Sequence, residues 1–214
     1  MNKTANYSLT IVIPVYNEED NIKRLQEVVG AYLPACPVPA CALFVNDGSK
    51  DRSLSAAMKA GIDTAESKYV GYMDADMQTD VRDFDLLLKY APEYPLVMGI
   101  RARRKDSAFK RMQSKIANSF RRMMTHTGCP LKILHTDYAK RVPFFTGMHR
   151  FLPALIQLQD GGKFYEIPVR HYPRQAGVSK YHLWNRLVSP FKDCFAFRWM
   201  AHRYINYQVG ENNL

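Results

Sequence analysis

The chain has 214 residues and a formal net charge of +10, and 47 % of its residues are apolar, as expected for a globular core. This size fits one domain, and no run approaches the ~20 apolar residues of a membrane-spanning helix. The basic excess predicts an anionic partner, but charge alone does not separate nucleotide phosphates, nucleic acids and anionic membrane surfaces. The first residues lack the shape of a signal peptide. The four cysteines lack metal-site spacing, so we expect free thiols in a reducing compartment.

Strands and helices are expected to alternate along the first hundred residues. Short apolar runs predict strands at 9–15, 41–45, 69–73 and 96–100. Apolar residues at helical spacing predict helices that begin after Asn17, at 53–60 and at 81–90. This alternation indicates an α/β fold in which helices flank a mainly parallel central sheet. In such sheets, ligands bind beyond the carboxyl ends of the strands.

Polar side chains follow all four of these strands. They are Asn17 and Glu18, then Asp47, then Asp74 and Asp76, then Arg101. Residues two apart in an extended chain point to the same side, so we expect Asp74 and Asp76 to face one point. Two hard oxygen ligands suit Mg²⁺ or Mn²⁺, which keeps much of its shell for water and substrate phosphates. A dinucleotide-binding domain would need a glycine-rich turn after the first strand, and residues 14–18 contain no glycine.

The second half of the chain carries most of the cationic segments. Arg101 and Arg104 follow a strand end closely enough to reach a diphosphate. Further along, we expect a helix with a solvated cationic face, a turn, the start of a helix and a strand, at 109–123, 127–132, 145–155 and 164–169. Residues 170–181 then predict a cationic loop with a flexible glycine, of the kind that closes over anionic ligands.

Four motifs, in chain order, make the sequence resemble the family 2 glycosyltransferases of GT-A fold. They are Ile13-Pro14-Val15-Tyr16-Asn17-Glu18, Asn46-Asp47-Gly48-Ser49, Asp74-Ala75-Asp76-Met77-Gln78 and the segment from Arg174 to Tyr181. The last segment is similar to the Arg-x-x-Gly-x-Ser-Lys loop of the polyprenyl-phosphate branch, which is like dolichyl-phosphate mannose synthase. The resemblance therefore extends from about residue 9 to residue 181 and favours this branch.

The resemblance implies roles for individual residues. Asp47 would read the nucleotide base, in a pocket shaped by Pro14, Tyr16 and Glu18. The metal, Mg²⁺ or Mn²⁺, would be held on the diphosphate by Asp74, Asp76 and Gln78. The catalytic residues would be Asp74, Asp76 and Arg101, and the donor and acceptor phosphates would be contacted by Arg101, Arg104, Arg174, Ser179 and Lys180.

Two positions depart from the family pattern. Asn46 replaces an aspartate that many members carry, which is a mild change. His126 stands where related chains often carry an aspartate before Thr-Gly, so no general-base role is carried over to this position. We interpret His126 as a structural histidine.

The resemblance implies an inverting transfer of a sugar from a nucleotide-diphosphate sugar to a polyprenyl phosphate, in cell-envelope synthesis. A phosphate monoester is largely a dianion at pH 7, so this acceptor needs positioning by cations more than deprotonation. One alternative is a family 2 transferase with a saccharide hydroxyl acceptor, which would need a base. A nucleic-acid binder is the non-enzymatic alternative, and the basic residues lack the interleaved aromatic platforms that it would use.

The sequence divides into a glycosyltransferase domain, 1–183, and an aromatic and basic segment, 184–214. A helix beyond Pro190 would carry one stripe of Phe191, Phe195 and Trp199 and a second stripe of Phe197, Met200 and Tyr204. We expect one stripe to pack on the domain while the other rests on anionic lipid headgroups at the cytoplasmic face of a membrane. The alternative is that both stripes pack into the protein or a partner, either a membrane protein or a second copy of the chain.

Overall fold

The computed structural model describes residues 6–15, 19–46, 53–101, 129–144, 147, 151–172 and 183–206. At 19–20, 53–54, 101 and 183–191 it describes the backbone alone. The strands are β1 (Leu9–Val15), β2 (Ala40–Asn46), β3 (Tyr69–Tyr72), β4 (Leu96–Arg101), β5 (Lys132–His135) and β6 (Phe164–Val169). The helices are α1 (Glu19–Tyr32), α2 (Ser53–Thr64), α3 (Phe84–Leu88), α5 (Thr136–Lys140), α6 (Leu152–Gln157) and α7 (Leu183–Ala201), with short 3-10 helices η1 (Leu33–Ala35) and η2 (Val81–Asp83).

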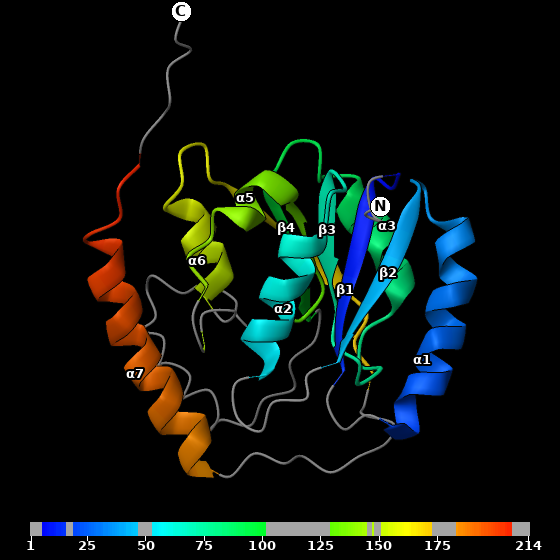
Figure 1. The fold of residues 1–214 in the computed structure, drawn as a ribbon, viewed down its shortest axis with the longest axis horizontal. Coiled ribbons are helices and arrows are strands. Elements are labelled where there is room, and N and C mark those ends of the chain that lie inside the picture. Colours follow the sequence, from blue (N-terminus) through cyan, green and yellow to red (C-terminus); the bar gives the residue numbers. More distant parts are fainter. Residues whose placement is uncertain are drawn as a thin grey trace, which may run out of the picture.

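These six strands form one sheet in the order β2-β1-β3-β5-β4-β6. β1 is parallel to β2 and β3, and β4 is parallel to β6, whereas β5 runs antiparallel to both of its neighbours. The expected α/β fold with a mainly parallel sheet is therefore confirmed. The carboxyl ends of all strands except β5 lie at the lower edge of the sheet in Figure 1, which we call the carboxyl edge.

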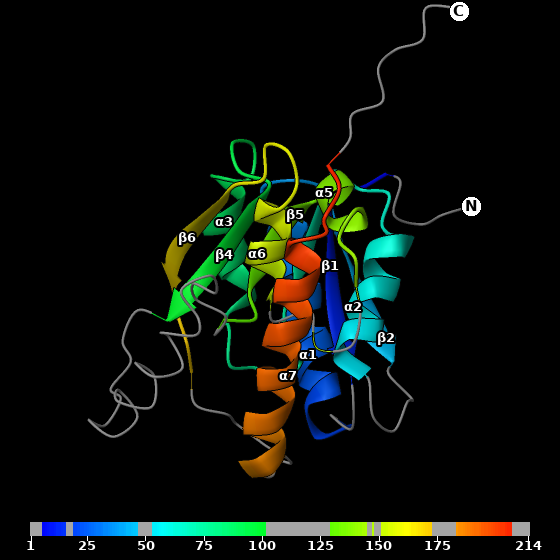
Figure 2. The same cartoon turned by 90° about the vertical axis from the view of Figure 1, so that its left-hand side faces the viewer.

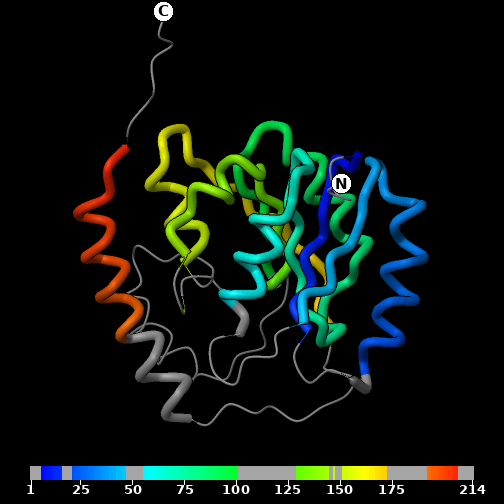
Figure 3. Tube along the Cα trace, viewed as in Figure 1, coloured from blue at the N-terminus to red at the C-terminus, as the bar shows by residue number. Residues whose placement is uncertain are grey.

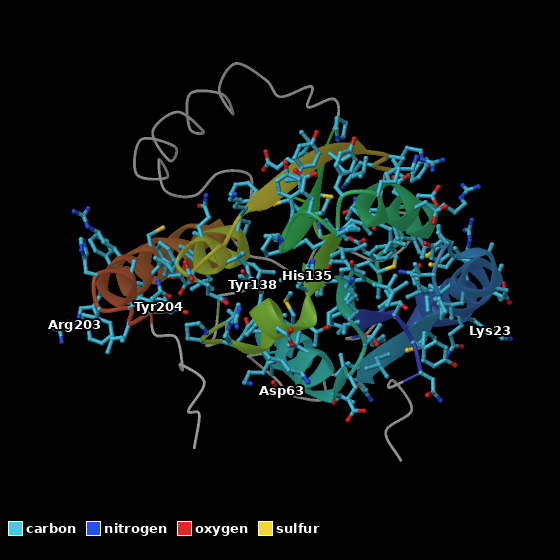
Figure 4. All side chains as sticks on the ribbon, turned by 90° about the horizontal axis from the view of Figure 1, so that it is seen from above. Lys23, Asp63, His135, Tyr138, Arg203 and Tyr204 are labelled. Atoms are coloured by element: carbon cyan, nitrogen blue, oxygen red, sulfur yellow. The ribbon has the colours of Figure 1, made fainter. Side chains whose placement is uncertain are left out.

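Helices cover both faces of the sheet because alternate strand residues point to opposite sides. Leu9, Ile11 and Ile13 of β1 belong to the core beneath α1 and α3, whereas Val12 belongs to the core beneath α2, α5 and α6. Seen from above, α2 and α5 lie on one side of the sheet and α3 lies on the other (Figure 4). The molecule thus has three layers, with α1 and α7 at its two lateral ends (Figure 3).

Gly71 of β3 allows α3 to pack closely on the centre of the sheet. A Cβ atom at this position would lie 3.0 Å from Cε1 of Phe84, the first residue of α3, and 3.4 Å from Cγ1 of Ile11. Both neighbouring side chains are fully buried, so neither has room to move aside. A side chain at residue 71 would therefore displace α3, which comes shortly after the end of β3 in the chain.

Helix α7 lies beside α6 on one flank of the domain (Figures 1 and 2). Phe197 is buried and stacks on Phe151, with ring centroids 5.2 Å apart. Phe195 and Trp199 face the opposite way and are 57 % and 64 % exposed. The stripe that contains Phe197 is therefore the one that packs on the domain. No helix in the described part of the chain is long and apolar enough to cross a membrane.

Two expected elements differ from the structure. Residues 127–132 were expected to form a turn, but Lys132 is the first residue of strand β5. This strand has only four residues and begins with a lysine, so its sequence shows no apolar periodicity. The C-terminal helix begins at Leu183 and contains Pro190, although a helix was expected only beyond this proline. A proline inside a helix costs about 3 kcal/mol, which packing along a 19-residue helix can offset.

Candidate active site at the carboxyl edge

The two aspartates of the Asp74–Gln78 segment lie just beyond β3, in a turn that we call the acidic turn. Strand β3 ends at Tyr72, and Ala75 and Asp76 already belong to the turn. Our expectation that the chain stays extended through both aspartates is therefore wrong. The two carboxylates are placed by the turn, and both side chains are partly exposed while Ala75 between them is buried.

Short hydrogen bonds fix the shape of this turn. The Tyr72 hydroxyl donates to Oδ1 of Asp74 at 2.7 Å, and the Gln78 backbone N–H donates to Oδ1 of Asp76 at 3.1 Å. Met77 between them has a φ of 57°, in the left-handed region. This conformation costs a residue with a side chain roughly 1–2 kcal/mol, so it persists only because its surroundings impose it.

Lys132 brings a buried cation to the carboxyl edge. Because β5 is antiparallel, its first residue pairs with Tyr72, the last residue of β3. The Lys132 ammonium donates to the carbonyl oxygen of Cys129 at 2.6 Å and lies 5.6 Å from the centre of the Tyr72 ring. Burial lowers the pKa of this ammonium, and the negative charge of Asp74 partly opposes the shift. The acidic turn therefore has a positive charge behind it.

The acidic turn is also joined to the chain that leaves β6. The Tyr172 N–H donates to the Gln78 carbonyl oxygen at 2.8 Å, and Nε2 of Gln78 lies 3.5 Å from the Tyr172 carbonyl oxygen. Thr79 and His171 form an antiparallel bridge beside this pair. Two segments about ninety residues apart in sequence are thus aligned at one edge.

An ion-pair cluster follows the turn. The Asp80 carboxylate accepts hydrogen bonds from Nε and Nη2 of Arg82, which hold the pKa of Asp80 below its usual range, and Arg170 adds a weaker effect in the same direction. Asp83 is fully buried and accepts hydrogen bonds from the backbone and guanidinium of Arg170. Both carboxylates are therefore bound by arginines.

The structure describes some of the predicted site residues and leaves others outside its described ranges. Asp74, Asp76 and Gln78 lie together in the acidic turn, and Pro14 is buried near the carboxyl end of β1, while Arg101 is the last residue of β4. The remaining predicted residues, and His126, lie outside the described residues: Tyr16, Glu18, Asp47, Arg104, His126, Arg174, Ser179 and Lys180.

Sequence reasoning missed the residues that support the acidic turn. Tyr72 was read as part of an apolar strand, and Lys132 as part of a turn. Asp83 and Arg170 were assigned no role. The detectable signal was a single lysine at the start of the apolar run Lys132–His135, since a lysine within a core strand needs a partner.

The residues of the acidic turn fit a divalent metal. They offer two carboxylates and one side-chain amide oxygen, which are hard oxygen ligands. The described residues contain no group of three or more His, Cys, Asp or Glu side chains that could hold a metal ion. This ligand set matches a cation that shares its coordination shell with substrate phosphates.

Comparison with known protein families relates the central part of the chain to one of them. The sequence model described as "Glycosyl transferase family 2" matches residues 50–152, which include the acidic turn and β5. This match agrees with the family resemblance of the sequence motifs.

Two relatives of the chain have names that include a polyprenyl phosphate. The dodecaprenyl-phosphate galacturonate synthase of Rhizobium johnstonii is 32 % identical over 207 residues, which cover 81 % of this chain and 61 % of the relative. The undecaprenyl-phosphate 4-deoxy-4-formamido-L-arabinose transferase of Pectobacterium carotovorum is 29 % identical over 205 residues, covering 81 % and 62 %. The chain spans less than two thirds of the length of these relatives.

Two solved structures share the fold. Mannosyl-3-phosphoglycerate synthase from Rubrobacter xylanophilus superposes with a TM-score of 0.66 at 15 % identity, covering 97 % of this chain and 78 % of that one. Glucosyl-3-phosphoglycerate synthase from Mycobacterium tuberculosis, in complex with Mn²⁺ and UDP-glucose, superposes with a TM-score of 0.64 at 13 % identity, covering 97 % and 83 %. At these identities the likeness concerns the fold.

The acidic turn generates the first testable prediction. Asp76→Asn removes one of the carboxylates predicted to bind the metal, so nucleotide affinity in Mn²⁺ should fall by about tenfold or more. Asp63→Asn is the matched control, because Asp63 is an exposed carboxylate on α2 that pairs with Lys59 (Figure 4). The measurement is isothermal titration with nucleoside diphosphate, with and without EDTA. Unchanged affinity in Asp76→Asn, or full affinity in EDTA, would refute the metal assignment.

Proposed function

We propose that the chain is an inverting, metal-dependent glycosyltransferase domain that moves a sugar from a nucleotide-diphosphate sugar to a polyprenyl phosphate. The single observation that carries the proposal is the junction between Gln78 and Tyr172. It joins the acidic turn, with its metal-ligand chemistry, to the strand exit from which the cationic segment of residues 174–181 continues. In this proposal, donor and acceptor phosphates would meet at one edge of the sheet. The names of the two relatives support the same acceptor class.

The donor side of the site is proposed from the strand ends. Pro14 lies near the carboxyl end of β1, and Tyr16 and Glu18 follow it in the sequence. Asp47 is the first residue after β2. These residues would bind the nucleotide. A bound Mg²⁺ or Mn²⁺ would neutralise the departing diphosphate, and Asp74, Asp76 and Gln78 would hold it. The Tyr72 hydroxyl, which donates to Oδ1 of Asp74, would keep that carboxylate oriented.

The acceptor chemistry requires cations and not a base. A polyprenyl phosphate has a second pKa of about 6, so at pH 7 its oxygen is already a nucleophile. Arg101, Arg104, Arg174, Ser179 and Lys180 would align this oxygen with the anomeric carbon of the donor and reduce the repulsion between the phosphates. His126 has no proton to remove in this scheme.

The proposed function is tested in two steps. Thermal shift with UDP, GDP and CDP in Mn²⁺ identifies the base, since a ligand that binds the folded state raises its apparent stability. The matching radiolabelled nucleotide-sugars are then incubated with undecaprenyl phosphate, and label should enter the lipid fraction. Label that enters a saccharide hydroxyl acceptor and not the lipid would overturn the proposed acceptor class.

The cationic segment generates a second prediction for this reaction. Arg174→Ala and Lys180→Ala each remove a charge-assisted hydrogen bond, worth about 1.5–3 kcal/mol, so transfer to polyprenyl phosphate should fall by about tenfold or more. Arg141→Ala is the control, because Arg141 follows α5 and its Nε donates to Oε1 of Gln159 at 3.1 Å. Steady-state kinetics measure the effect. If both variants transfer sugar at the wild-type rate, Arg174 and Lys180 do not bind the acceptor phosphate.

We also propose that α7 rests on the cytoplasmic face of a membrane. Phe195 and Trp199 form an exposed aromatic stripe, and the Arg203 guanidinium lies 5.2 Å from the Trp199 ring centre. Aromatic rings beside cations favour the interface between lipid headgroups and acyl chains. Such contact would bring the enzyme to a lipid-linked acceptor. A small membrane protein or a second copy of the chain is the alternative occupant of this stripe.

Liposome flotation with anionic lipid tests this contact. Replacing Phe195 and Trp199 together by serine should shift the protein from the floating to the soluble fraction, because the exposed aromatic rings are lost. The buried side of α7 stays unchanged in this variant. The control is Tyr90→Ser, which alters an exposed aromatic on another face. If wild type stays soluble at low salt, direct lipid contact is wrong and a partner protein would have to bring enzyme and lipid together.

A further inference from the structure

Tyr72, the last residue of β3, brings a buried hydroxyl to the acidic turn. In the sheet it pairs with Val12 of β1 on one side and with Lys132 of β5 on the other. Its side chain belongs to the core beneath α2, α5 and α6, and the residue is only 4 % exposed. The ring therefore has little room to move, and its hydroxyl is a fixed donor that lies 2.7 Å from Oδ1 of Asp74.

One oxygen of each carboxylate in the acidic turn is thus engaged by a donor of the chain itself. Oδ1 of Asp74 accepts from the Tyr72 hydroxyl, and Oδ1 of Asp76 accepts from the Gln78 N–H at 3.1 Å. The second donor is part of the backbone, next to the left-handed Met77. Binding of both oxygens of either carboxylate to one cation would therefore compete with a hydrogen bond that shapes the turn.

Divalent cations differ in how they use carboxylates. Ca²⁺ takes about six to eight oxygen ligands and commonly binds both oxygens of one carboxylate. Mg²⁺ is smaller, keeps several waters, and is usually held by one or two carboxylates together with substrate phosphates. A pair of carboxylates that each have one oxygen engaged suits Mg²⁺ better than Ca²⁺. The two-aspartate motif alone does not distinguish these cations, since carboxylate oxygen suits both.

We propose that Tyr72 is a positioning residue that determines the metal selectivity of the acidic turn: its hydroxyl competes for Oδ1 of Asp74 and thereby favours Mg²⁺ over Ca²⁺. The inference deepens the proposed function and rests on it, because that function assigns a divalent cation to Asp74 and Asp76. Tyr72 acts through Asp74 and does not touch the substrate. A hydrogen bond to a charged group is stronger than one between neutral groups, so its loss should have a measurable effect.

Tyr72→Phe tests the proposal, because it removes the hydroxyl and keeps the ring. UDP, GDP and CDP are titrated in turn into the protein by isothermal titration, once in excess Mg²⁺ and once in excess Ca²⁺. The quantity of interest is the selectivity ratio, the nucleotide Kd in Ca²⁺ divided by the nucleotide Kd in Mg²⁺. This ratio should exceed one in wild type and should fall by about tenfold in Tyr72→Phe, the factor expected for one hydrogen bond to a charged group.

Tyr69→Phe is the matched control, because it makes the same substitution at the other end of β3. Tyr69 is also buried, and its ring meets the His135 ring edge-on with centroids 5.0 Å apart. The selectivity ratio of this variant should stay within about twofold of wild type. General damage to the fold would weaken nucleotide binding in both cations alike, so the ratio separates positioning from a merely structural role. Circular dichroism checks that each variant is folded.

Wild type alone already exposes the proposal to refutation, whether or not Tyr72→Phe folds. If wild type binds nucleotide as tightly in Ca²⁺ as in Mg²⁺, the turn does not select between the cations. A wild-type selectivity ratio in folded Tyr72→Phe would equally overturn the role of the hydroxyl. Either result would leave the proposed sugar transfer untouched.

The proposed function fails in a different way. If the ratio changes as expected but no sugar enters the lipid fraction, the acceptor class is wrong and the role of Tyr72 at the metal site holds. If wild type binds nucleotide equally well in excess EDTA, the acidic turn holds no metal, and both the metal dependence and the role of Tyr72 are refuted.

Discussion

The site depends on a turn that holds two carboxylates, two residues apart, at one edge of the sheet. The Tyr72 hydroxyl donates to Asp74, and the Gln78 backbone N–H donates to Asp76. The left-handed Met77 is part of the same arrangement, because it turns the Gln78 N–H back toward Asp76. Hydrogen bonds within the chain thus fix the shape of the turn, which reduces the reorganisation that ligand binding would require.

The antiparallel strand explains how the cation reaches this position. In a purely parallel sheet, every strand would end at the carboxyl edge, and no strand would place its first residue there. β5 runs the other way, so Lys132 at its start pairs with Tyr72 at the end of β3. Its ammonium lies behind the acidic turn, bonded to the Cys129 carbonyl. One reversed strand therefore places a lysine side chain at the carboxyl edge without a loop to position it.

Charge distribution also separates the two parts of the site. The chain is strongly cationic overall, yet its acidic turn would repel a diphosphate in the absence of a metal. In the proposed reaction, a divalent cation would reverse the sign of the charge at that point and make donor binding favourable. The acceptor phosphate would instead be bound by the cationic segment that follows β6 in the sequence. The Gln78–Tyr172 hydrogen bonds join the acidic turn to the chain that leads into this segment.

The elements with regular periodicity could be predicted from the sequence, and those determined by distant contacts could not. β1 and β6 have the predicted bounds, because each is a bounded apolar run. β5 was missed because four residues that begin with lysine do not look like a central strand. Asp74 and Asp76 lie in one turn, but the extended geometry assumed for them was wrong. Neither the φ of Met77 nor the pairing of Asp83 with Arg170 has a local signal, since each depends on chain segments far apart in sequence.

The position of α7 links the exposed aromatic stripe to the same edge. Gly147 has a φ of 87°, and a Cβ atom there would collide with the carboxylate of Asp193 on α7. The Gly147 N–H donates to the Ser55 hydroxyl at 3.2 Å, in the first turn of α2, and α2 starts at the carboxyl edge (Figure 1). The part of α7 around Asp193 is thereby fixed near that edge, and Phe195 follows two residues later. Because Phe197 stacks on Phe151 by the other face of the helix, Phe195 and Trp199 are left on the exposed side of α7. The packing that orients the helix therefore also determines which of its aromatic residues are free to meet another surface.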